Sequence, residues 1–102
     1  KTLPKQSQAT LLSIFQLNKV SKDKILTGDV YEKYKFHCEA SGLKTLTQRR
    51  LSDLIAELDL LGIINAKVVS KGRYGRTREI KLAIPPTSLP SLDKELKGWL
   101  GI

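Results

Sequence analysis

The chain has 102 residues and a net charge of +8 at neutral pH, with 40% hydrophobic and 27% charged residues. This length provides one compact domain with a single core, and the composition is that of a folded protein rather than a disordered one. No apolar run approaches the roughly 20 residues that cross a bilayer, and the N-terminus lacks the apolar stretch of a signal peptide. We therefore expect neither membrane insertion nor secretion.

The only cysteine, Cys38, stands beside the only histidine, His37. One cysteine cannot form an intrachain disulfide, and this pair cannot supply the three or four ligands of a zinc site. A single histidine also leaves no set of residues for Ser/His/Asp or Cys/His catalysis. We expect no enzyme activity, no metal and no cofactor, and we expect both residues at the edge of the core in a reducing, cytoplasmic setting.

The first predicted helix covers residues 5–17, and Pro4 suits its start because the first turn does not need the missing N–H. Its apolar stripe repeats at helical spacing and consists of Leu11, Ile14 and Phe15, widened by Leu12 and Leu17. The polar run of residues 18–24 breaks this periodicity and predicts a loop. Ile25 and Leu26 then predict a very short strand.

A second helix follows, with Thr27 predicted as its N-cap and Asp29 favourable in its first turn. Its buried face repeats every four residues and consists of Val30, Tyr34 and Cys38, with Tyr31 beside them. Gly42 predicts the end of this helix.

The third helix has the strongest pattern, a stripe that consists of Leu51, Leu54, Ile55, Leu58 and Leu61 and that we expect to be buried throughout. Thr47 is a good N-cap, but Thr45 competes with it, because Gln48 three residues later would complete a capping box. Gly62 predicts the end of the helix.

After Gly62 the period changes to two, which predicts strands over residues 63–69 and 78–84. Gly72 and Gly75 between them permit the backbone angles of a hairpin tip. Residues 85–102 predict a C-terminal helical tail, whose stripe consists of Leu92, Leu96, Trp99 and Leu100. We accordingly divide the chain into a domain of residues 1–84 and a tail of residues 85–102.

This order of elements predicts the α+β class and the winged helix-turn-helix fold. The fold would have a three-helix core, a short strand, a β-hairpin wing and an additional C-terminal helix. A short turn over residues 42–46 joins the second and third helices, as a helix-turn-helix requires. In such folds the second helix of this motif enters the DNA major groove, where each base pair presents a distinct pattern of donors and acceptors.

Arg49 lies nearly opposite the leucine stripe when the third helix is drawn at 100° per residue. Gln48 and Arg50 flank it, and the small Ser52 and Ala56 on the same side would let the helix approach bases closely. Arginine can contact guanine O6 and N7 together, and glutamine can contact adenine N6 and N7. The alternative interpretation is that these arginines form an ordinary solvated surface.

The predicted hairpin carries six basic residues, namely Lys67, Lys71, Arg73, Arg76, Arg78 and Lys81, against one acidic residue, Glu79. Lysine would suffice for solubility, whereas the planar guanidinium of arginine suits phosphate and base recognition. Arg73 and Arg76 near the tip are placed to enter a minor groove, whose negative potential attracts arginine. Tyr74 would either pack against a sugar or phosphate, or brace the turn.

Four segments carry a family resemblance: LPKQSQATLLSIF, LTGDVYEKYKFHCEASGL, LTQRRLSDLIAELDLLGII and VVSKGRYGRTREIKL. They resemble the C-terminal winged-helix domain of archaeal origin-recognition/cell-division-control initiators over residues 3–82. The resemblance implies an AAA+ replication initiator that binds double-stranded DNA at origin repeats. Its ATPase module would lie upstream, outside this chain, and the replicative helicase would be a further partner.

The resemblance places the recognition helix in the major groove and the wing on the minor groove and backbone. Together with the charge pattern, it predicts the DNA-binding residues Thr47, Gln48, Arg49, Arg50, Ser52, Lys71, Gly72, Arg73, Tyr74, Gly75, Arg76 and Arg78. The leading hypothesis is a nucleoid-associated module that reads origin DNA. The alternatives are a winged-helix transcription regulator and a winged helix that docks an acidic protein partner.

Overall fold

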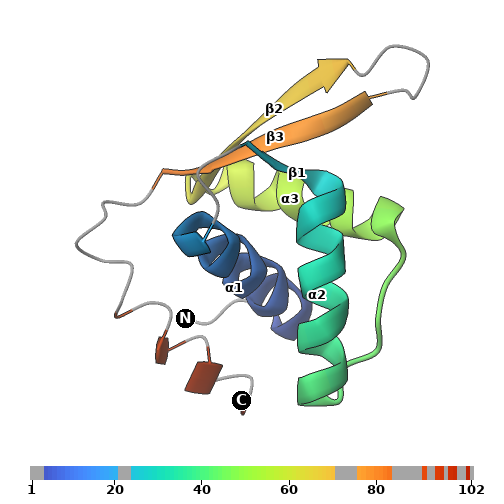
Figure 1. Ribbon diagram of the computed structural model, residues 1–102, viewed down its shortest axis with the longest axis vertical. Coiled ribbons are helices and arrows are strands. Elements are labelled where there is room, and N and C mark those ends of the chain that lie inside the picture. Colours follow the sequence, from blue (N-terminus) through green and yellow to red (C-terminus); the bar gives the residue numbers. More distant parts are fainter. Residues whose placement is uncertain are drawn as a thin grey trace.

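A computed structural model describes residues 4–20, 24–70 and 76–83, together with residues 91, 94–95, 97–98 and 101. Its elements in chain order are α1 (Lys5–Val20), β1 (Ile25–Leu26), α2 (Thr27–Ser41), α3 (Gln48–Leu60), β2 (Ile64–Ser70) and β3 (Arg76–Leu82). Figure 1 shows the hairpin of β2 and β3 above the three helices, with α3 running beneath it. This arrangement confirms the α+β class and the winged-helix plan. Within the described ranges, no helix is both long enough and apolar enough to cross a membrane.

Helix α1 is the centre of the fold. Nine consecutive residues, from Ser7 to Phe15, are buried, so the helix is covered on every side rather than along the predicted stripe alone. Its buried hydroxyls are satisfied within the helix: Thr10 donates to the Gln6 carbonyl and Ser13 to the Ala9 carbonyl, both at 2.8 Å. Helix α1 also continues to Val20, and the predicted loop start at residue 18 is wrong, because polar residues on an exposed last turn do not end a helix.

Helix α2 buries the predicted face, with Val30, Tyr34 and Cys38 each 0% exposed. Gly42 ends the helix with a left-handed backbone angle, φ of 73°, as its position predicts. The prediction of Thr27 as N-cap is wrong, because Leu26 occupies that position. The Thr27 hydroxyl instead accepts a hydrogen bond from the backbone N–H of Arg78 at 3.1 Å, so it is used between elements.

The turn between α2 and α3 is held by side chains from α1 and α2. The Gln6 amide donates to the Lys44 carbonyl at 2.8 Å, and the Tyr31 hydroxyl donates to the Leu46 carbonyl at 2.9 Å. The Leu46 N–H donates to the Tyr34 hydroxyl at 3.0 Å, and that hydroxyl in turn donates to the Gln6 side-chain oxygen. The position at which α3 begins is therefore set by the two preceding helices.

Helix α3 packs on this frame through Leu51, Ile55 and Leu58, which are buried. The predicted stripe is wrong at two positions, since Leu54 is only half-buried and Leu61, at its end, is 62% exposed. The helix stops at Leu60 and the chain turns at Gly62, with φ of 79°, so Leu61 lies past the last contact with the core. At the other end the Thr47 hydroxyl accepts the Arg50 N–H at 3.2 Å, which confirms Thr47 as the N-cap.

The sheet has the order β1-β3-β2, and both pairs are antiparallel. The long ladder runs from Ser70 opposite Arg76 to Ile64 opposite Leu82. Strand β3 therefore begins two residues before the predicted 78–84, because pairing with β2 already starts at Arg76. Of the predicted second strand, Ile84 lies outside the described residues.

The tail is described only at separate positions, of which residues 91, 94, 95, 97 and 98 are helical. The stripe predicted there, Leu92, Leu96, Trp99 and Leu100, lies outside the described residues. The division of the chain after residue 84 therefore stays a prediction.

The core position of α3 yields a first testable prediction. Ile55 is 0% exposed, so Ile55→Ala should lower the free energy of unfolding by about 2–5 kcal/mol through lost burial and a residual cavity. Leu60 on the same helix is 87% exposed, and Leu60→Ala should change that free energy by no more than about 0.5 kcal/mol. Urea denaturation followed by circular dichroism measures both, and equal losses would contradict this packing.

The buried Tyr34 yields a second prediction, on alkaline stability. Loss of hydration on burial raises the pKa of Tyr34 to about 12, above its ordinary value of 10.0. Between these values the unfolded chain ionises at this residue while the folded chain stays neutral, so the free energy of unfolding should fall as pH rises above 10. The expected loss is about 1 kcal/mol by pH 11. The free energy of unfolding of Tyr34→Phe, measured by urea denaturation from pH 8 to 11, should not show this additional fall. If the free energies of the variant and of wild type decline in parallel with pH, the ionisation of Tyr34 is not the cause.

Candidate nucleic-acid interface

A cleft lies between α3 and the β2–β3 hairpin. Its volume is about 300 Å³, and its lining residues are Thr27, Gln48, Ser52, Val68, Thr77 and Arg78. These residues come from the first residue of α2, the first two turns of α3 and the two hairpin strands. The fold thus places the outer side of α3 and the inner side of the hairpin against one shared space.

The first turn of α3 presents polar and basic side chains to solvent. The N-cap at Thr47 starts the helix so that Leu51 points into the core, and Gln48, Arg49 and Arg50 are all exposed. Ser52 is half-buried and lines the cleft. A helix N-terminus also carries unpaired N–H groups and a positive partial charge, which favour an anion. This end of α3 is therefore suited to a polyanionic partner.

The inner face of the hairpin extends beyond the core. Residues on one face of a strand recur every second position, so Arg78 is on the same face of β3 as the buried Ile80. Its partner in the ladder, Val68, is on the same face of β2 as the buried Ile64 but is 51% exposed. The core-facing side of the wing therefore continues past the core as a wall of the cleft.

Arg78 joins three elements at this point. Its guanidinium Nη1 donates to the Ser52 carbonyl of α3 at 3.0 Å, and its backbone N–H donates to the Thr27 hydroxyl of α2 at 3.1 Å. A guanidinium has five N–H donors, so the contact with Ser52 orients this side chain without using all its donors. The arginine is thus held in place in the lining of the cleft.

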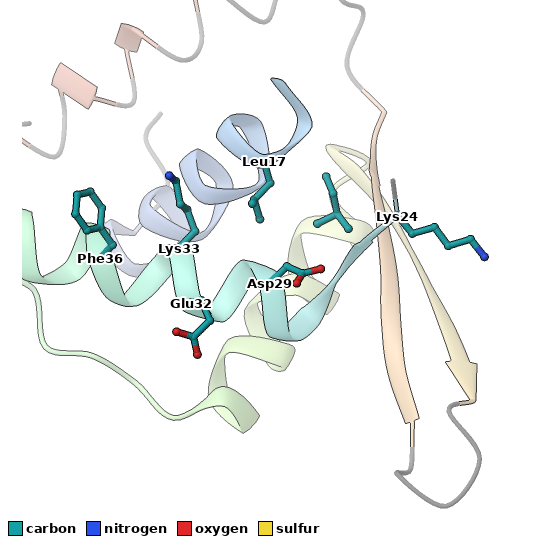
Figure 2. A pocket seen from close by; sticks show the side chains of 7 residues that line it. Leu17, Lys24, Asp29, Glu32, Lys33 and Phe36 are labelled. Carbon is teal, nitrogen blue, oxygen red and sulfur yellow. The ribbon is translucent and has the colours of Figure 1, made fainter. Parts of the chain in front are cut away.

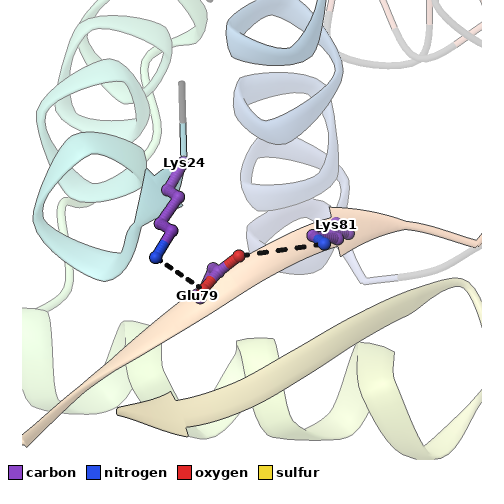
Figure 3. A network of polar contacts seen from close by, with 3 residues as sticks. All are labelled: Lys24, Glu79 and Lys81. Carbon is purple, nitrogen blue, oxygen red and sulfur yellow. Dashed lines mark ion pairs between the residues drawn. The ribbon is translucent and has the colours of Figure 1, made fainter. Parts of the chain in front are cut away.

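The acidic residue of the hairpin is balanced by two lysines. Figure 3 shows Glu79 between Lys24, whose Nζ is 3.8 Å from one carboxylate oxygen, and Lys81, whose Nζ is 3.9 Å from the other. The Glu79 side chain is 15% exposed. Contacts of this length contribute little to stability, but they offset the negative charge beside the wing.

The described part of the interface contains only some of the predicted DNA-binding residues. Gln48, Ser52 and Arg78 meet at the cleft, while Arg49 and Arg50 are exposed on the same turn as Gln48. The hairpin tip with Lys71, Gly72, Arg73, Tyr74 and Gly75 lies outside the described residues, and Arg76 is described only as the first residue of β3.

Three lining residues, Thr27, Val68 and Thr77, were not among the predicted DNA-binding residues. Alternation along the strands could have indicated Val68, since it shares the face of Ile64. Thr77 and Thr27 carry no comparable sequence signal, because only the packing of β3 against α2 brings them to the cleft.

A second hollow, of about 630 Å³, has a different chemistry. The described residues around it come from α1, α2 and the start of β1, and Figure 2 shows Leu17, Asp29, Glu32, Lys33 and Phe36 at its margin. Acidic and basic side chains alternate there around an apolar surface. It therefore lacks the one-sided positive charge that a polyanion requires.

The His37–Cys38 pair, predicted at the edge of the core, is buried, with 3% and 0% exposure, and Cys38 belongs to the core itself. His37 Nε2 lies 2.9 Å from the side-chain oxygen of Gln16. Burial raises the pKa of the Cys38 thiol, which disfavours the reactive thiolate. Among the residues that the structure describes, no three His, Cys, Asp or Glu side chains are grouped as a metal site would require.

Comparison with known proteins identifies the family. The family profile described as CDC6, C-terminal winged helix domain, matches residues 1–90. The chain belongs to the CDC6 C-terminal winged-helix family. Two relatives named ORC1-type DNA replication protein are similar to this CDC6 domain. The protein of Thermococcus onnurineus is 54% identical over 105 residues, covering 100% of this chain, and that of Pyrococcus furiosus is 60% identical over 84 residues, covering 82%.

The CDC6 domain spans only 25% and 20% of the length of these two relatives. The ATPase module that the resemblance places upstream is therefore not part of this chain.

Solved structures agree with this assignment. The structure of the Aeropyrum pernix Orc1 protein in complex with DNA matches with a TM-score of 0.78 and 41% identity, over 91% of this chain and 24% of that one. Cdc6p from Pyrobaculum aerophilum matches with a TM-score of 0.75 over 97% of this chain and 24% of its own, and at 23% identity it supports the fold alone.

Proposed function

We propose that this CDC6 winged-helix domain binds double-stranded DNA at replication origins, with a sequence preference, as the DNA-reading domain of a replication initiator. The observation that carries the proposal is the cleft in which the first turn of α3 and the inner face of the hairpin meet. The similar Aeropyrum pernix Orc1 protein was solved in complex with DNA, which supports the same partner for this chain.

The first turn of α3 enters the major groove in this proposal. Arg49 is exposed on the side away from Leu51, and Gln48 and Arg50 are exposed beside it. These side chains can pair with guanine and adenine edges, which supplies the sequence preference. Thr47 and Ser52 flank them and are suited to contact phosphate oxygens.

The wing contacts the adjacent minor groove and backbone. Its proposed DNA-binding residues are Lys71, Gly72, Arg73, Tyr74, Gly75, Arg76 and Arg78. Their charge neutralises phosphates without regard to sequence, and arginine near the tip suits the negative potential of a narrow minor groove.

The names of the relatives favour replication over the alternative of a transcription regulator. In the full-length protein we expect an AAA+ module upstream and the replicative helicase as a further partner. The other alternative is that the domain docks an acidic protein. Titration of labelled duplex at several salt concentrations distinguishes this alternative from DNA binding. Neutralisation of phosphates gives a steep fall of affinity with salt, and an affinity that does not respond to salt would overturn the proposal.

A prediction concerns base reading by Arg49. With a duplex selected by this domain from a random pool, Arg49→Ala should cost about 1–3 kcal/mol of binding free energy. On a duplex of unrelated sequence the cost should be smaller, because only the base contact is lost. Fluorescence anisotropy with both duplexes measures the difference, and equal losses on the two would exclude a base-reading role.

A further prediction concerns the wing. Arg73→Ala combined with Arg76→Ala should weaken binding to every duplex and reduce the slope of log affinity against log salt by about 1.8, or roughly 0.9 for each lost phosphate contact. The matched control removes two charges from α2, through Lys33→Gln and Lys35→Gln, and should leave the slope unchanged. A wing variant with the slope of wild type would remove the wing from the interface.

A further inference from the structure

The inference rests on the proposed function and concerns the cleft between α3 and the hairpin. When a helix occupies the major groove and a wing the adjacent minor groove, one sugar-phosphate strand of the duplex must pass between them. In this domain the space between the two elements is the cleft of about 300 Å³. We propose that this cleft is the binding site for a single backbone unit, one phosphate with its adjoining deoxyribose.

The lining of the cleft provides suitable donors for a phosphate. Arg78 provides a guanidinium and Ser52 a hydroxyl group. Groups of these types make most of the phosphate contacts in protein–DNA complexes. None of the described lining residues is acidic, and Glu79 next in sequence to Arg78 is paired with Lys24 and Lys81.

Arg78 is oriented before the ligand arrives. One of its five N–H donors is held by the Ser52 carbonyl at 3.0 Å, and the backbone N–H is held by Thr27 at 3.1 Å. An arginine that is already ordered loses less rotational freedom when it binds than a solvated lysine would. The side chain therefore forms a preorganised phosphate contact at the junction of the wing and the recognition helix.

Val68 provides the surface for the sugar. It faces Arg78 across the strand ladder and is 51% exposed, although its neighbours on the same strand face, Ala66 and Ile64, belong to the core or pack against it. An apolar side chain on the wall of an otherwise polar cleft matches the apolar face of deoxyribose. The cleft thus offers a charged contact to the phosphate, through Arg78, and an apolar contact to the deoxyribose, through Val68.

The first experiment measures binding of the 102-residue chain to duplex DNA at several salt concentrations. Arg78→Gln should weaken binding roughly tenfold or more and lower the slope of log affinity against log salt by about 0.9, equally on selected and unrelated duplexes. Arg78→Lys keeps the charge and should keep the slope. Lys33→Gln removes one charge from α2, outside the cleft, and should change neither quantity.

The second experiment uses duplexes in which one phosphate at a time is replaced by a neutral methylphosphonate. For wild type, one position between the two contacted grooves should cost roughly tenfold in affinity. The same replacement should hardly lower the affinity of Arg78→Gln, because this variant already lacks the contact between Arg78 and that phosphate. Val68→Ser should weaken binding while leaving both the salt slope and this sensitivity intact.

The outcomes separate this proposal from the proposed function. One outcome is that wild type binds with steep salt dependence while Arg78→Gln shows the same slope. In that outcome Arg78 only connects the wing to α3, and the proposed backbone site is wrong. DNA binding by the domain would still stand. Failure of wild type to bind duplex would overturn the proposed function itself. If circular dichroism finds Arg78→Gln unfolded, Arg78→Lys and the methylphosphonate scan on wild type still test the backbone site. A scan in which no position lowers the affinity would exclude that site.

Discussion

The orientation of α3 depends above all on how the turn between α2 and α3 is held. The Tyr34 hydroxyl accepts the Leu46 N–H and donates to Gln6, so one buried group connects α1, α2 and this turn. Tyr31 and Gln6 bind further carbonyls of the same turn. Because α3 begins directly after it, these contacts set both the direction of α3 and the side that it buries.

The hairpin is connected to the helices through β1 and through Arg78. Strand β3 lies in the middle of the sheet and pairs with β1, which leads directly into α2. Arg78 adds contacts from β3 to Thr27 and Ser52. The cleft between wing and helix is therefore bounded by hydrogen-bonded elements on both sides, and its width is a property of the folded domain before any ligand is present.

Charge is distributed unevenly over the domain, in keeping with this architecture. Of the five arginines of the chain, Arg49 and Arg50 lie on the first turn of α3 and Arg76 and Arg78 on β3, whereas the hollow formed by α1 and α2 mixes acidic and basic side chains. The one carboxylate of β3, Glu79, is offset by Lys24 and Lys81. Arg78 lines the cleft, and Arg49 and Arg50 are exposed on the same turn of α3 as Gln48, which also lines it.

The sequence by itself determined the features that depend on near neighbours. The core face of α2, the inner positions Leu51, Ile55 and Leu58 of α3 and the glycine helix ends follow from spacings of a few residues, and the structure confirms them. The sequence offered Thr45 and Thr47 as N-caps of α3, and the structure decided for Thr47. The tertiary structure alone decided the burial of α1 on every side, the exposure of Leu61 and the use of the Thr27 hydroxyl by β3. It also decided the contact between Arg78 and Ser52. These depend on partners 26 to 51 residues away in the chain, or on which element happens to cover a given surface, and no local periodicity carries that information.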